Sequence, residues 1–242
     1  MAHCAHIPAF VLHQVTCQFA TGQTLFGPLS VSLEPSLCGL VGRNGVGKTR
    51  LLRLLAGLDS PAGGHIERAA AVAWVAQQPT LTPETTLATL LGYASVFAAL
   101  SRLEQGQGLA DDFDLLDGHW DLTDRLSLAF READLPPFSA DRPAFSLSGG
   151  ERMKALLCGA FVSGADYLLL DEPTNHLDRQ GREWLYHQLE SWQGGALIAS
   201  HDRELLTRMP RIIELTPTAL RSYGGNYDEY QRQRMAEQQA AR

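Results

Sequence analysis

A glycine-rich segment is the first part of this sequence whose residue types and spacing could do chemistry. Residues 42–49 read Gly-Arg-Asn-Gly-Val-Gly-Lys-Thr, which fits the pattern G-x-x-x-x-G-K-[ST]. The glycines let backbone N–H groups converge on phosphate oxygens, and the N-terminus of the helix that follows favours an anion. In such a loop Lys48 would reach the outer phosphates of a nucleotide, and Thr49 would reach its Mg²⁺ ion. The segment therefore predicts a phosphate-binding loop.

Two adjacent carboxylates form a second candidate group. Residues 167–172 read Tyr-Leu-Leu-Leu-Asp-Glu, an apolar strand that ends in Asp171 and Glu172. A strand beside the phosphate-binding loop would place Asp171 near the metal ion, and Glu172, one residue further, could polarise an attacking water. Apolar strands often end in acidic residues, so the pair indicates a catalytic site only in combination with the phosphate-binding loop. Together the two segments predict hydrolysis of a bound nucleotide.

A third segment lies between these two in the chain. Residues 147–151 read Leu-Ser-Gly-Gly-Glu, and Ser148 is expected to cap a helix whose free N–H groups face an anion. The simpler alternative is a loop with an ordinary helix cap. That alternative does not explain the position of the segment among the other motifs.

The elements that must position these groups alternate between strands and helices. A mostly parallel sheet with helices on both faces is expected from this alternation. Residues 82–84, Thr-Pro-Glu, resemble a helix start with Thr82 as the cap, and the apolar stretch 87–100 predicts one buried amphipathic helix. Strands are expected over 10–19, 29–33, 37–41, 66–67, 71–76, 167–170 and 196–200, and helices over 48–56, 148–162, 179–192 and from 203.

The composition excludes several classes of protein. The chain has 242 residues and a formal charge of −7, from 20 basic and 27 acidic residues, which argues against broad nucleic-acid binding. Its acidic residues gather between 111 and 124, where a solvated helical face is expected. No stretch of about 18 apolar residues exists, so nothing is expected to span a membrane. The gathered acids are Asp111, Asp112, Asp114, Asp117, Asp121 and Asp124.

The cysteines show neither a CxxC pair nor metal-ligand spacing, so reduced thiols in the cytosol are expected. They are Cys4, Cys17, Cys38 and Cys158. Cys38 and Cys158 stand in apolar surroundings and are expected to be packing residues.

The order of the motifs resembles that of ATP-binding cassette (ABC) proteins, and residues 147–151 resemble their signature motif. The resemblance covers nearly the whole chain. It implies an α/β fold, a P-loop NTPase core with an antiparallel β subdomain and an inserted helical subdomain at about 83–150, within an ATPase domain of 1–226. It also implies that two cassettes meet head to tail, so that Ser148, Gly149 and Gly150 of one close on the γ-phosphate held by the other.

The same resemblance gives roles to further residues. Gln77 resembles the Q-loop glutamine, with Gln78 as the competing choice, and residues 175–178 resemble the D-loop that ends in Asp178. Phe19 resembles the aromatic that stacks on adenine, although Phe26 is near. The implied catalytic residues are Glu172, His201 and Gln77; the ATP contacts are Phe19, Gly42, Arg43, Asn44, Gly45, Gly47, Lys48 and Thr49; and the Mg²⁺ ligands are Thr49, Asp171 and Gln77.

Residues 171–178 and 200–203 resemble those of the F subfamily (ABC-F), and 223–230 resemble the end of its first cassette. The resemblance implies that 227–242 begin a helical interdomain linker. It also implies a cytoplasmic, Mg²⁺-dependent ATPase without membrane insertion, which works with a second cassette in the same longer chain or in a second copy. Many members act on ribosomes, and such a role would involve regions absent from this sequence.

Two alternatives stay open. The ATPase subunit of a membrane transporter would share every nucleotide motif, although the Asn-His of 175–176 and the Gly-Gly-Asn-Tyr of 224–227 argue against it. A cassette that senses ATP without turnover would be expected to lack Glu172 or His201. Arg50 departs from the family pattern, since a second hydroxyl residue is usual there, and Lys154 stands in place of an arginine.

Overall fold

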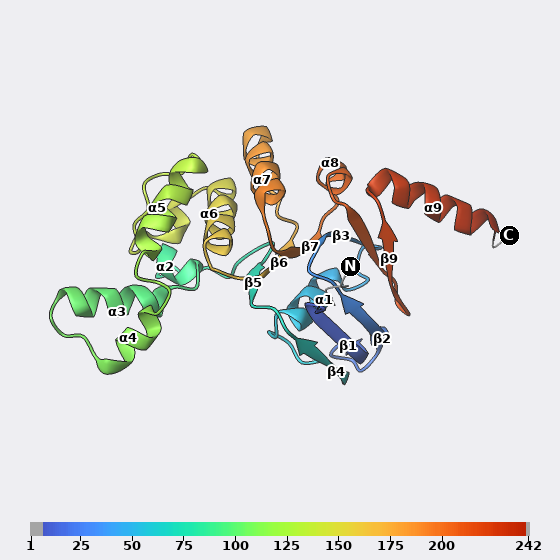
Figure 1. Cartoon of the computed structure of the whole chain (residues 1–242), viewed down its shortest axis with the longest axis horizontal. Helices are drawn as coiled ribbons and strands as arrows, with labels where there is room; N and C mark the ends of the chain where they lie inside the picture. Colours follow the sequence, from blue (N-terminus) through green and yellow to red (C-terminus); the bar gives the residue numbers. More distant parts are fainter. Residues whose placement is uncertain (1–6, 241–242) are drawn as a thin grey trace, which may run out of the picture. The chain divides into compact units, whose positions relative to one another are not determined.

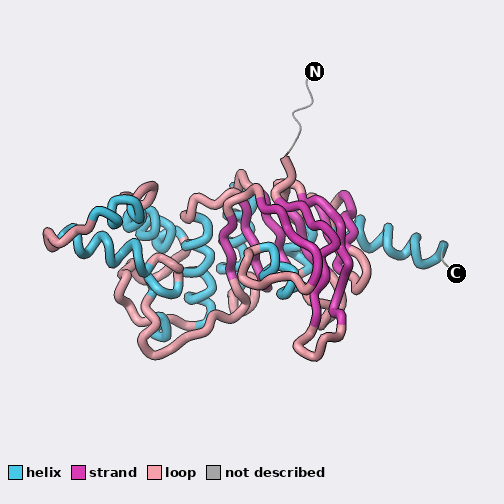
Figure 2. The backbone as a smooth tube through the Cα atoms, turned by 90° about the horizontal axis from the view of Figure 1, so that it is seen from below, coloured by secondary structure: helices cyan, strands magenta, loops and turns pink. Residues whose placement is uncertain are grey.

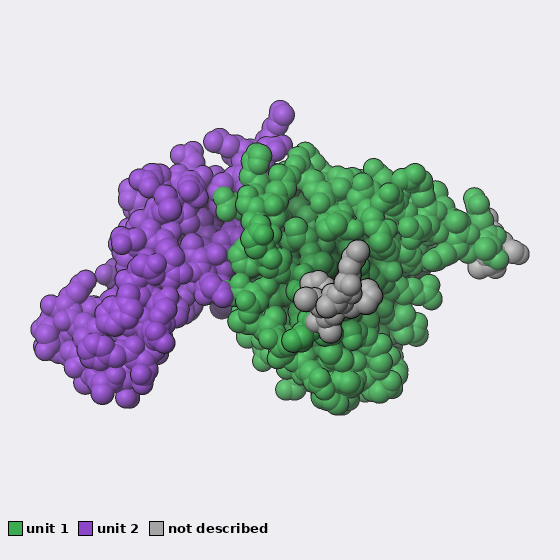
Figure 3. Space-filling model, viewed as in Figure 1, with its two compact units in different colours: residues 1–77, 165–174, 185–242 green, residues 78–164, 175–184 purple. Residues whose placement is uncertain are grey.

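The computed structural model describes residues 7–240, which divide into two compact units (Figure 3). The first unit consists of residues up to 77, 165–174 and from 185 onward, and the second consists of 78–164 and 175–184. The chain therefore leaves the first unit twice and returns each time. Residues 83–150, where a helical subdomain is expected, lie within the second unit.

A sheet of six strands forms the centre of the first unit, in the order β5-β6-β7-β3-β8-β9 (Figure 1). Neighbouring strands are parallel except for β9, which is antiparallel to β8. The inner strands β6 and β7 are buried throughout, as expected for parallel strands covered on both faces. The strands are β3 (Leu37–Val41), β5 (Val72–Val75), β6 (Tyr167–Asp171), β7 (Gly195–Ala199), β8 (Arg211–Leu215) and β9 (Leu220–Gly224).

A second, antiparallel sheet has the order β2-β1-β4 and consists of β1 (Phe10–Gln18), β2 (Thr24–Leu33) and β4 (Gly63–Arg68). Its strands lie side by side where they are labelled in Figure 1, and Figure 2 draws the strands of both sheets in magenta. Along β1, Phe10 and Leu12 are buried whereas His13 lies on the outer face. The buried leucines of α1 (Lys48–Leu55) share one core with residues of both sheets. This core holds α1, and hence the loop before it, in place.

Three helices complete the first unit: the C-terminal part of α7 (Arg179–Ser191), α8 (Arg203–Thr207) and α9 (Tyr227–Ala240). Asp202 caps α8 by accepting hydrogen bonds from two backbone N–H groups. Helix α9 buries none of its residues but contacts β8 and β9. That it begins a linker stays a prediction.

The second unit is helical and has its own core. Leu116, Leu126, Phe130, Ala155 and Cys158 belong to this core. Its elements are α2 (Leu87–Leu90), α3 (Ala94–Glu104), α4 (Ala110–Leu116), α5 (Leu122–Glu132), the 3₁₀ turn Ala144–Ser146, α6 (Gly149–Phe161) and the start of α7. None of the helices within 7–240 is both long and apolar enough to cross a membrane.

Three expectations about local structure are wrong. The helix predicted to start at Thr82 begins at Leu87 and is capped by Thr86, because residues 82–85 form a turn closed by the Thr82 carbonyl. The single helix expected over 87–100 is divided into α2 and α3 at Gly92, whose φ of 80° ends a helix. Strand β2 begins at Thr24 rather than at residue 29, since an edge strand tolerates the Gly-Pro pair within it.

The acidic segment is also not uniformly solvated. Asp112 is buried, and its carboxylate accepts hydrogen bonds from the Arg102 guanidinium and the Leu109 backbone. The guanidinium holds the pKa of Asp112 below its usual value. Cys38 and Cys158 are buried, as expected, and burial raises the pKa of Cys158 to about 12. Cys4 lies outside the described residues.

Candidate nucleotide-binding site

The glycine-rich loop connects the buried strand β3 to α1. Gly45 and Gly47 have φ values of 79° and 106°, which only glycine adopts readily. A Cβ atom at Gly47 would lie within 2.9 Å of Leu25 and Phe26 on β2. The glycine therefore lets the loop turn closely over β2 and deliver its N–H groups to one place at the start of α1.

Lys48 folds back across the loop, where its Nζ donates a hydrogen bond to the Gly42 carbonyl at 3.3 Å. Burial lowers the pKa of Lys48, while the nearby carboxylates of Glu172 and Asp171 act in the opposite direction. The ammonium group thus lies between the loop and two acids. An incoming phosphate would compete with the Gly42 carbonyl for it.

Thr49 and Asp171 are 122 positions apart in the sequence, but the fold joins them. The Thr49 hydroxyl donates to Asp171 Oδ2 at 2.6 Å. Burial raises the pKa of Asp171, and the hydrogen bond from Thr49 and the charge of Lys48 oppose that rise. A hydroxyl and a carboxylate are hard oxygen ligands, so this pair fits the requirements of Mg²⁺.

Glu172 follows β6 in a left-handed conformation, with φ of 50°. Such a conformation is unusual for a glutamate and is held here by neighbouring β7, where Ala199 O accepts from the Glu172 N–H at 2.8 Å. The carboxylate contacts His201 twice: Oε1 lies 3.4 Å from the imidazole Nε2, and Oε2 accepts from the backbone N–H at 3.3 Å. Glu172 and His201 therefore form a pair at the carboxyl ends of β6 and β7.

The environment of Glu172 favours its neutral form. Its side chain is 11% exposed, whereas that of His201 is 60% exposed. Burial raises the pKa of Glu172, and the neighbouring Asp171 adds to that rise. The charges of His201 and Lys48 partly offset the effect. A raised pKa is what a general base needs to work near neutral pH.

Gln77 and Phe19 are exposed, and both belong to the first compact unit, which also contains the phosphate-binding loop. Gln77 follows β5, which pairs with β6 so that Val75 lies opposite Leu170. It therefore leaves the sheet at the same edge as Asp171. Phe19, 48% exposed, lies in the turn after β1, while Phe26 is fully buried and offers no free ring face. The geometry favours Phe19 over Phe26 as a stacking residue.

Sequence reasoning missed a group of residues beside the loop. A pocket of about 450 Å³ adjoins Arg43 and Gly45, and Glu214 and Arg234 line it as well. Glu214 is buried on β8, and the Arg234 guanidinium of α9 lies 3.1 Å from its carboxylate. The only signal in the sequence was one acid within an apolar strand.

The signature segment lies in the second unit and begins α6. Ser148 caps the helix in a reciprocal arrangement: its backbone N–H donates to Glu151 Oε2 at 2.7 Å, and its hydroxyl accepts from the Glu151 N–H at 3.2 Å. The Ser148 N–H lowers the pKa of Glu151. Ser148 is exposed, so its hydroxyl can donate a hydrogen bond to a ligand at the start of α6.

The two glycines after Ser148 lie against the D-loop segment. A Cβ atom at Gly150 would lie 2.7 Å from the His176 carbonyl, and one at Gly149 would lie 3.6 Å from its side chain. Asp178 accepts a hydrogen bond from the Gly181 N–H at 2.7 Å. In the second unit, the fold therefore brings residues 148–150 next to residues 175–178. In the first unit, it brings together the phosphate loop, Asp171, Glu172 and His201.

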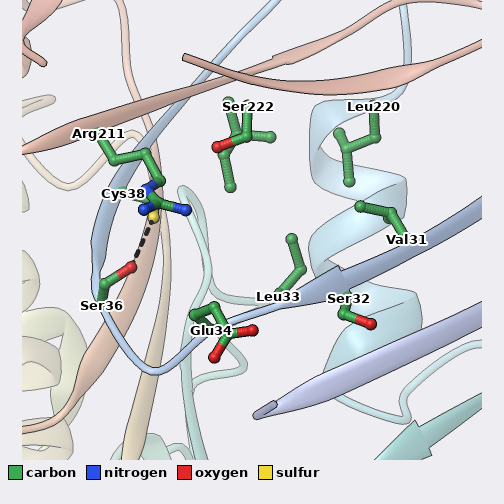
Figure 4. Close-up of a pocket in the computed structure, with 10 residues that line it drawn as sticks. Val31, Ser32, Leu33, Glu34, Ser36, Cys38, Arg211, Leu220 and Ser222 are labelled. Atoms are coloured by element: carbon green, nitrogen blue, oxygen red, sulfur yellow. Dashed lines mark hydrogen bonds between the residues drawn. The ribbon is translucent and has the colours of Figure 1, made fainter. Parts of the chain in front are cut away.

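A small pocket of about 40 Å³ lies near the start of β3 (Figure 4). Ser36 and Cys38 contact each other there, with their Oγ and Sγ atoms 3.3 Å apart. Burial raises the pKa of Cys38, so its thiol is a poor nucleophile. The pocket is large enough for little more than a water molecule, and we assign the pocket no role.

The fold and the two motif clusters define a nucleotide-binding α/β protein of cassette type. A family model described as ABC transporter matches residues 27–175. The chain therefore belongs to the ABC transporter family.

Two curated relatives share 34% identity with this chain. One is the energy-dependent translational throttle protein EttA of Mycobacterium tuberculosis, matched over 93% of this chain and 41% of that protein. The other is the probable ATP-binding protein YheS of Escherichia coli, matched over 84% of this chain and 34% of that protein. The chain spans less than half the length of these relatives. They confirm the resemblance to the F subfamily.

Solved structures support the fold. A structure described as the ATP-binding subunit of an ABC transporter gives a TM-score of 0.70 at 21% identity, covering 93% of this chain and 92% of that one. A bacterial ABC transporter cassette solved as a dimer gives 0.65 at 19% identity, covering 89% and 98%. Likeness at this identity shows the fold alone. The transporter-subunit alternative is not favoured, because the ABC-F relatives match at higher identity.

Proposed function

We propose that this chain binds Mg-ATP on residues 42–49 and hydrolyses it, as one cassette of an ABC-F-type protein. The observation that carries the proposal is the convergence at one end of the parallel sheet. There the phosphate loop, the Thr49–Asp171 pair and the Glu172–His201 pair come together from separate parts of the chain. This is the set of groups that ATP hydrolysis requires.

In the proposed reaction, Lys48 and the loop N–H groups bind the phosphates and orient the γ-phosphorus. Glu172 holds the attacking water and accepts its proton, and its raised pKa suits that task. His201 positions the Glu172 carboxylate and reaches the γ-phosphate. Thr49, Asp171 and Gln77 would hold Mg²⁺, which neutralises negative charge on the β- and γ-phosphates.

The signature residues serve a different nucleotide in this proposal. Ser148, Gly149 and Gly150 present the N-terminus of α6 to a γ-phosphate bound by a second cassette, with Asp178 near the interface. The exposure of the Ser148 cap supports this role. So does the dimer formed by a cassette of the same fold. The second cassette is supplied by a second copy or by the remainder of a longer chain.

The relatives suggest a wider role. One is named for throttling translation, and we propose that the whole protein acts on ribosomes in the cytoplasm through regions beyond this sequence. Residues 1–226 would then form the cassette, with 83–150 as its helical subdomain. Helix α9 would start the linker over 227–242.

The test replaces Glu172 by glutamine, which keeps the shape of the side chain but cannot accept the proton. Glu172→Gln should bind Mg-ATP with near-normal affinity and hydrolyse it roughly 10²- to 10⁴-fold more slowly. Lys48→Ala should lose ATP binding in calorimetry while keeping its melting temperature. Glu204→Gln, an exposed carboxylate on α8, is the matched control and should retain normal turnover.

Near-normal turnover by Glu172→Gln would contradict the role of Glu172 as the base. Unchanged ATP affinity in Lys48→Ala would contradict the phosphate-loop assignment itself. The two variants therefore test separate parts of the proposal.

A further inference from the structure

The outer face of the antiparallel sheet carries a second group of potential ligands, which shares no residue with the nucleotide site. His13 on β1 and His65 on β4 are directly opposite each other in the strand register. Glu67 follows two positions after His65, so it points to the same face. Strands β1 and β4 lie side by side (Figure 1). Three side chains from two strands thus meet at one place on the surface.

The ligand atoms converge on one carboxylate oxygen. Glu67 Oε1 lies 3.1 Å from His13 Nε2 and 3.9 Å from His65 Nε2. One ligand atom from each residue lies within 4.8 Å of the other two. Ligands bound at 2.0–2.1 Å to a tetrahedral ion are about 3.3 Å apart. The two distances to Glu67 Oε1 lie on either side of that value, and the exposed imidazoles would have to rotate out of their stacked arrangement so that both Nε2 lone pairs point at one ion.

The backbone fixes the position of His13. Gln14, the next residue, has φ of 51° in a bulge of β1, and both its N–H and its side-chain amide donate to Ser30 Oγ. The opposing Gly64 has φ of 75°, and a Cβ atom there would lie 2.2 Å from the His13 carbonyl. A bulge of this kind turns a side chain to a defined direction. Here it leaves the imidazole rings of His13 and His65 stacked with centroids 4.5 Å apart.

We propose that His13, His65 and Glu67 bind a divalent transition metal ion, with Zn²⁺ as the expected occupant. Two imidazoles and one carboxylate suit Zn²⁺ rather than Mg²⁺, so this site and the nucleotide site select different ions. The three residues leave a fourth coordination position for water or another ligand. Because residues 13 and 65 belong to different strands, the ion would tie β1 to β4.

The test is zinc titration of the 242-residue chain by calorimetry, with millimolar Mg²⁺ present. His3, Cys4 and His6 lie outside the described residues and are potential zinc ligands, so every protein in the test also carries His3→Ala, Cys4→Ala and His6→Ala. Loss of a ligand should weaken zinc binding at least roughly tenfold, since even an outer-shell partner contributes about 10- to 100-fold. The variants are His13→Ala, His65→Ala and Glu67→Gln.

His187→Ala is the matched control, because His187 pairs with a single glutamate, Glu190, on α7. It should bind zinc as the parent protein does. Substitutions at His13 and His65 should preserve the fold, since their side chains are 43% and 67% exposed. Circular dichroism checks that point.

A second readout is thermal. Zinc at about a hundred times the parent's Kd should raise the melting temperature of the parent by roughly 5 to 10 °C, and at the same zinc concentration that rise should fall to about half or less in His65→Ala. Co²⁺ in place of zinc should give the visible absorption of a tetrahedral ion only while both histidines are present. Equal zinc affinity in the parent, His13→Ala and His65→Ala would overturn the proposal.

Discussion

At the scale of single residues, Glu172 combines three unfavourable features. It is a non-glycine residue at positive φ, it is buried, and it lies near the acid Asp171. Strained and desolvated groups of this kind persist where function requires them. The hydrogen bonds to β7 and to His201 hold the carboxylate in place against these costs. The burial of this carboxylate also predicts a measurable effect on the stability of the protein.

Glu172→Gln should stabilise the nucleotide-free protein at neutral pH. Because burial raises the pKa of Glu172 above its ordinary 4.5, the ionised form destabilises the folded state at every pH above that range. As the pH falls through the raised pKa, the folded protein takes up the proton and the cost disappears. The variant should therefore melt a few degrees higher than the parent near pH 7. For a chain of this size, a gain of about 1 kcal/mol in the free energy of unfolding raises the melting temperature by roughly 2–4 °C.

Thermal unfolding of both proteins between about pH 7 and pH 4.5 measures this difference. The gap in melting temperature should shrink steadily toward the acid end. A variant that melts lower than the parent at neutral pH would show that the contacts with His201 outweigh the burial of the charge.

At the scale of elements, the start of α6 has a structural role as well as its proposed functional one. Ser148→Ala removes one half of the reciprocal cap with Glu151 and should destabilise the protein by about 0.5–2 kcal/mol. Ser148→Asp should retain the cap, because aspartate is an equally good capping residue. Ser127→Ala, an exposed position within α5, is the control and should have little effect. Urea unfolding distinguishes the three, and equal loss in all of them would contradict the assignment.

The order of the elements could be predicted from the sequence because apolar runs and glycine punctuation mark them. Strand β3 has the predicted bounds, and α6 begins after Ser148 as expected. The sequence is less informative where a local signal competes with contacts made by distant residues. Thr82 was expected to cap a helix, but residues 82–85 form a turn, and residues 85 and 87 make backbone hydrogen bonds with the distant residues Ala144 and Arg142. In the same way, Asp112 looks solvated until α3 brings Arg102 to it.

The residues of the candidate nucleotide site could be proposed from the sequence because each of them lies in a short motif with a fixed spacing. The contact between Thr49 and Asp171 follows once α1 and β6 are known to be neighbours. The group of His13, His65 and Glu67 was not predictable, because it depends on the register of two strands 52 positions apart and on a bulge. Register is set by packing and by turn geometry, which single-sequence patterns do not reveal.

At the scale of the whole molecule, the chain holds both a phosphate loop and a signature segment, one in each compact unit. The proposed function assigns them to different nucleotides, so under that proposal a single cassette would be an incomplete enzyme. Covalent linkage to a second cassette would give an effective concentration in about the millimolar range. A free chain at micromolar concentration lacks that advantage, so its ATP-driven association should be weak unless hydrolysis is blocked.

The most direct test of this account is the mass of Glu172→Gln measured by light scattering with Mg-ATP over a range of protein concentrations. We expect one chain without nucleotide or with ADP, and two chains with ATP, because only the γ-phosphate would contact both halves. Adding Ser148→Arg, which places bulk and charge at the signature, should return the mass to one chain while ATP binding persists. An ATP-driven dimer that survives Ser148→Arg, or a single-chain mass at every concentration of ATP and protein, would contradict it.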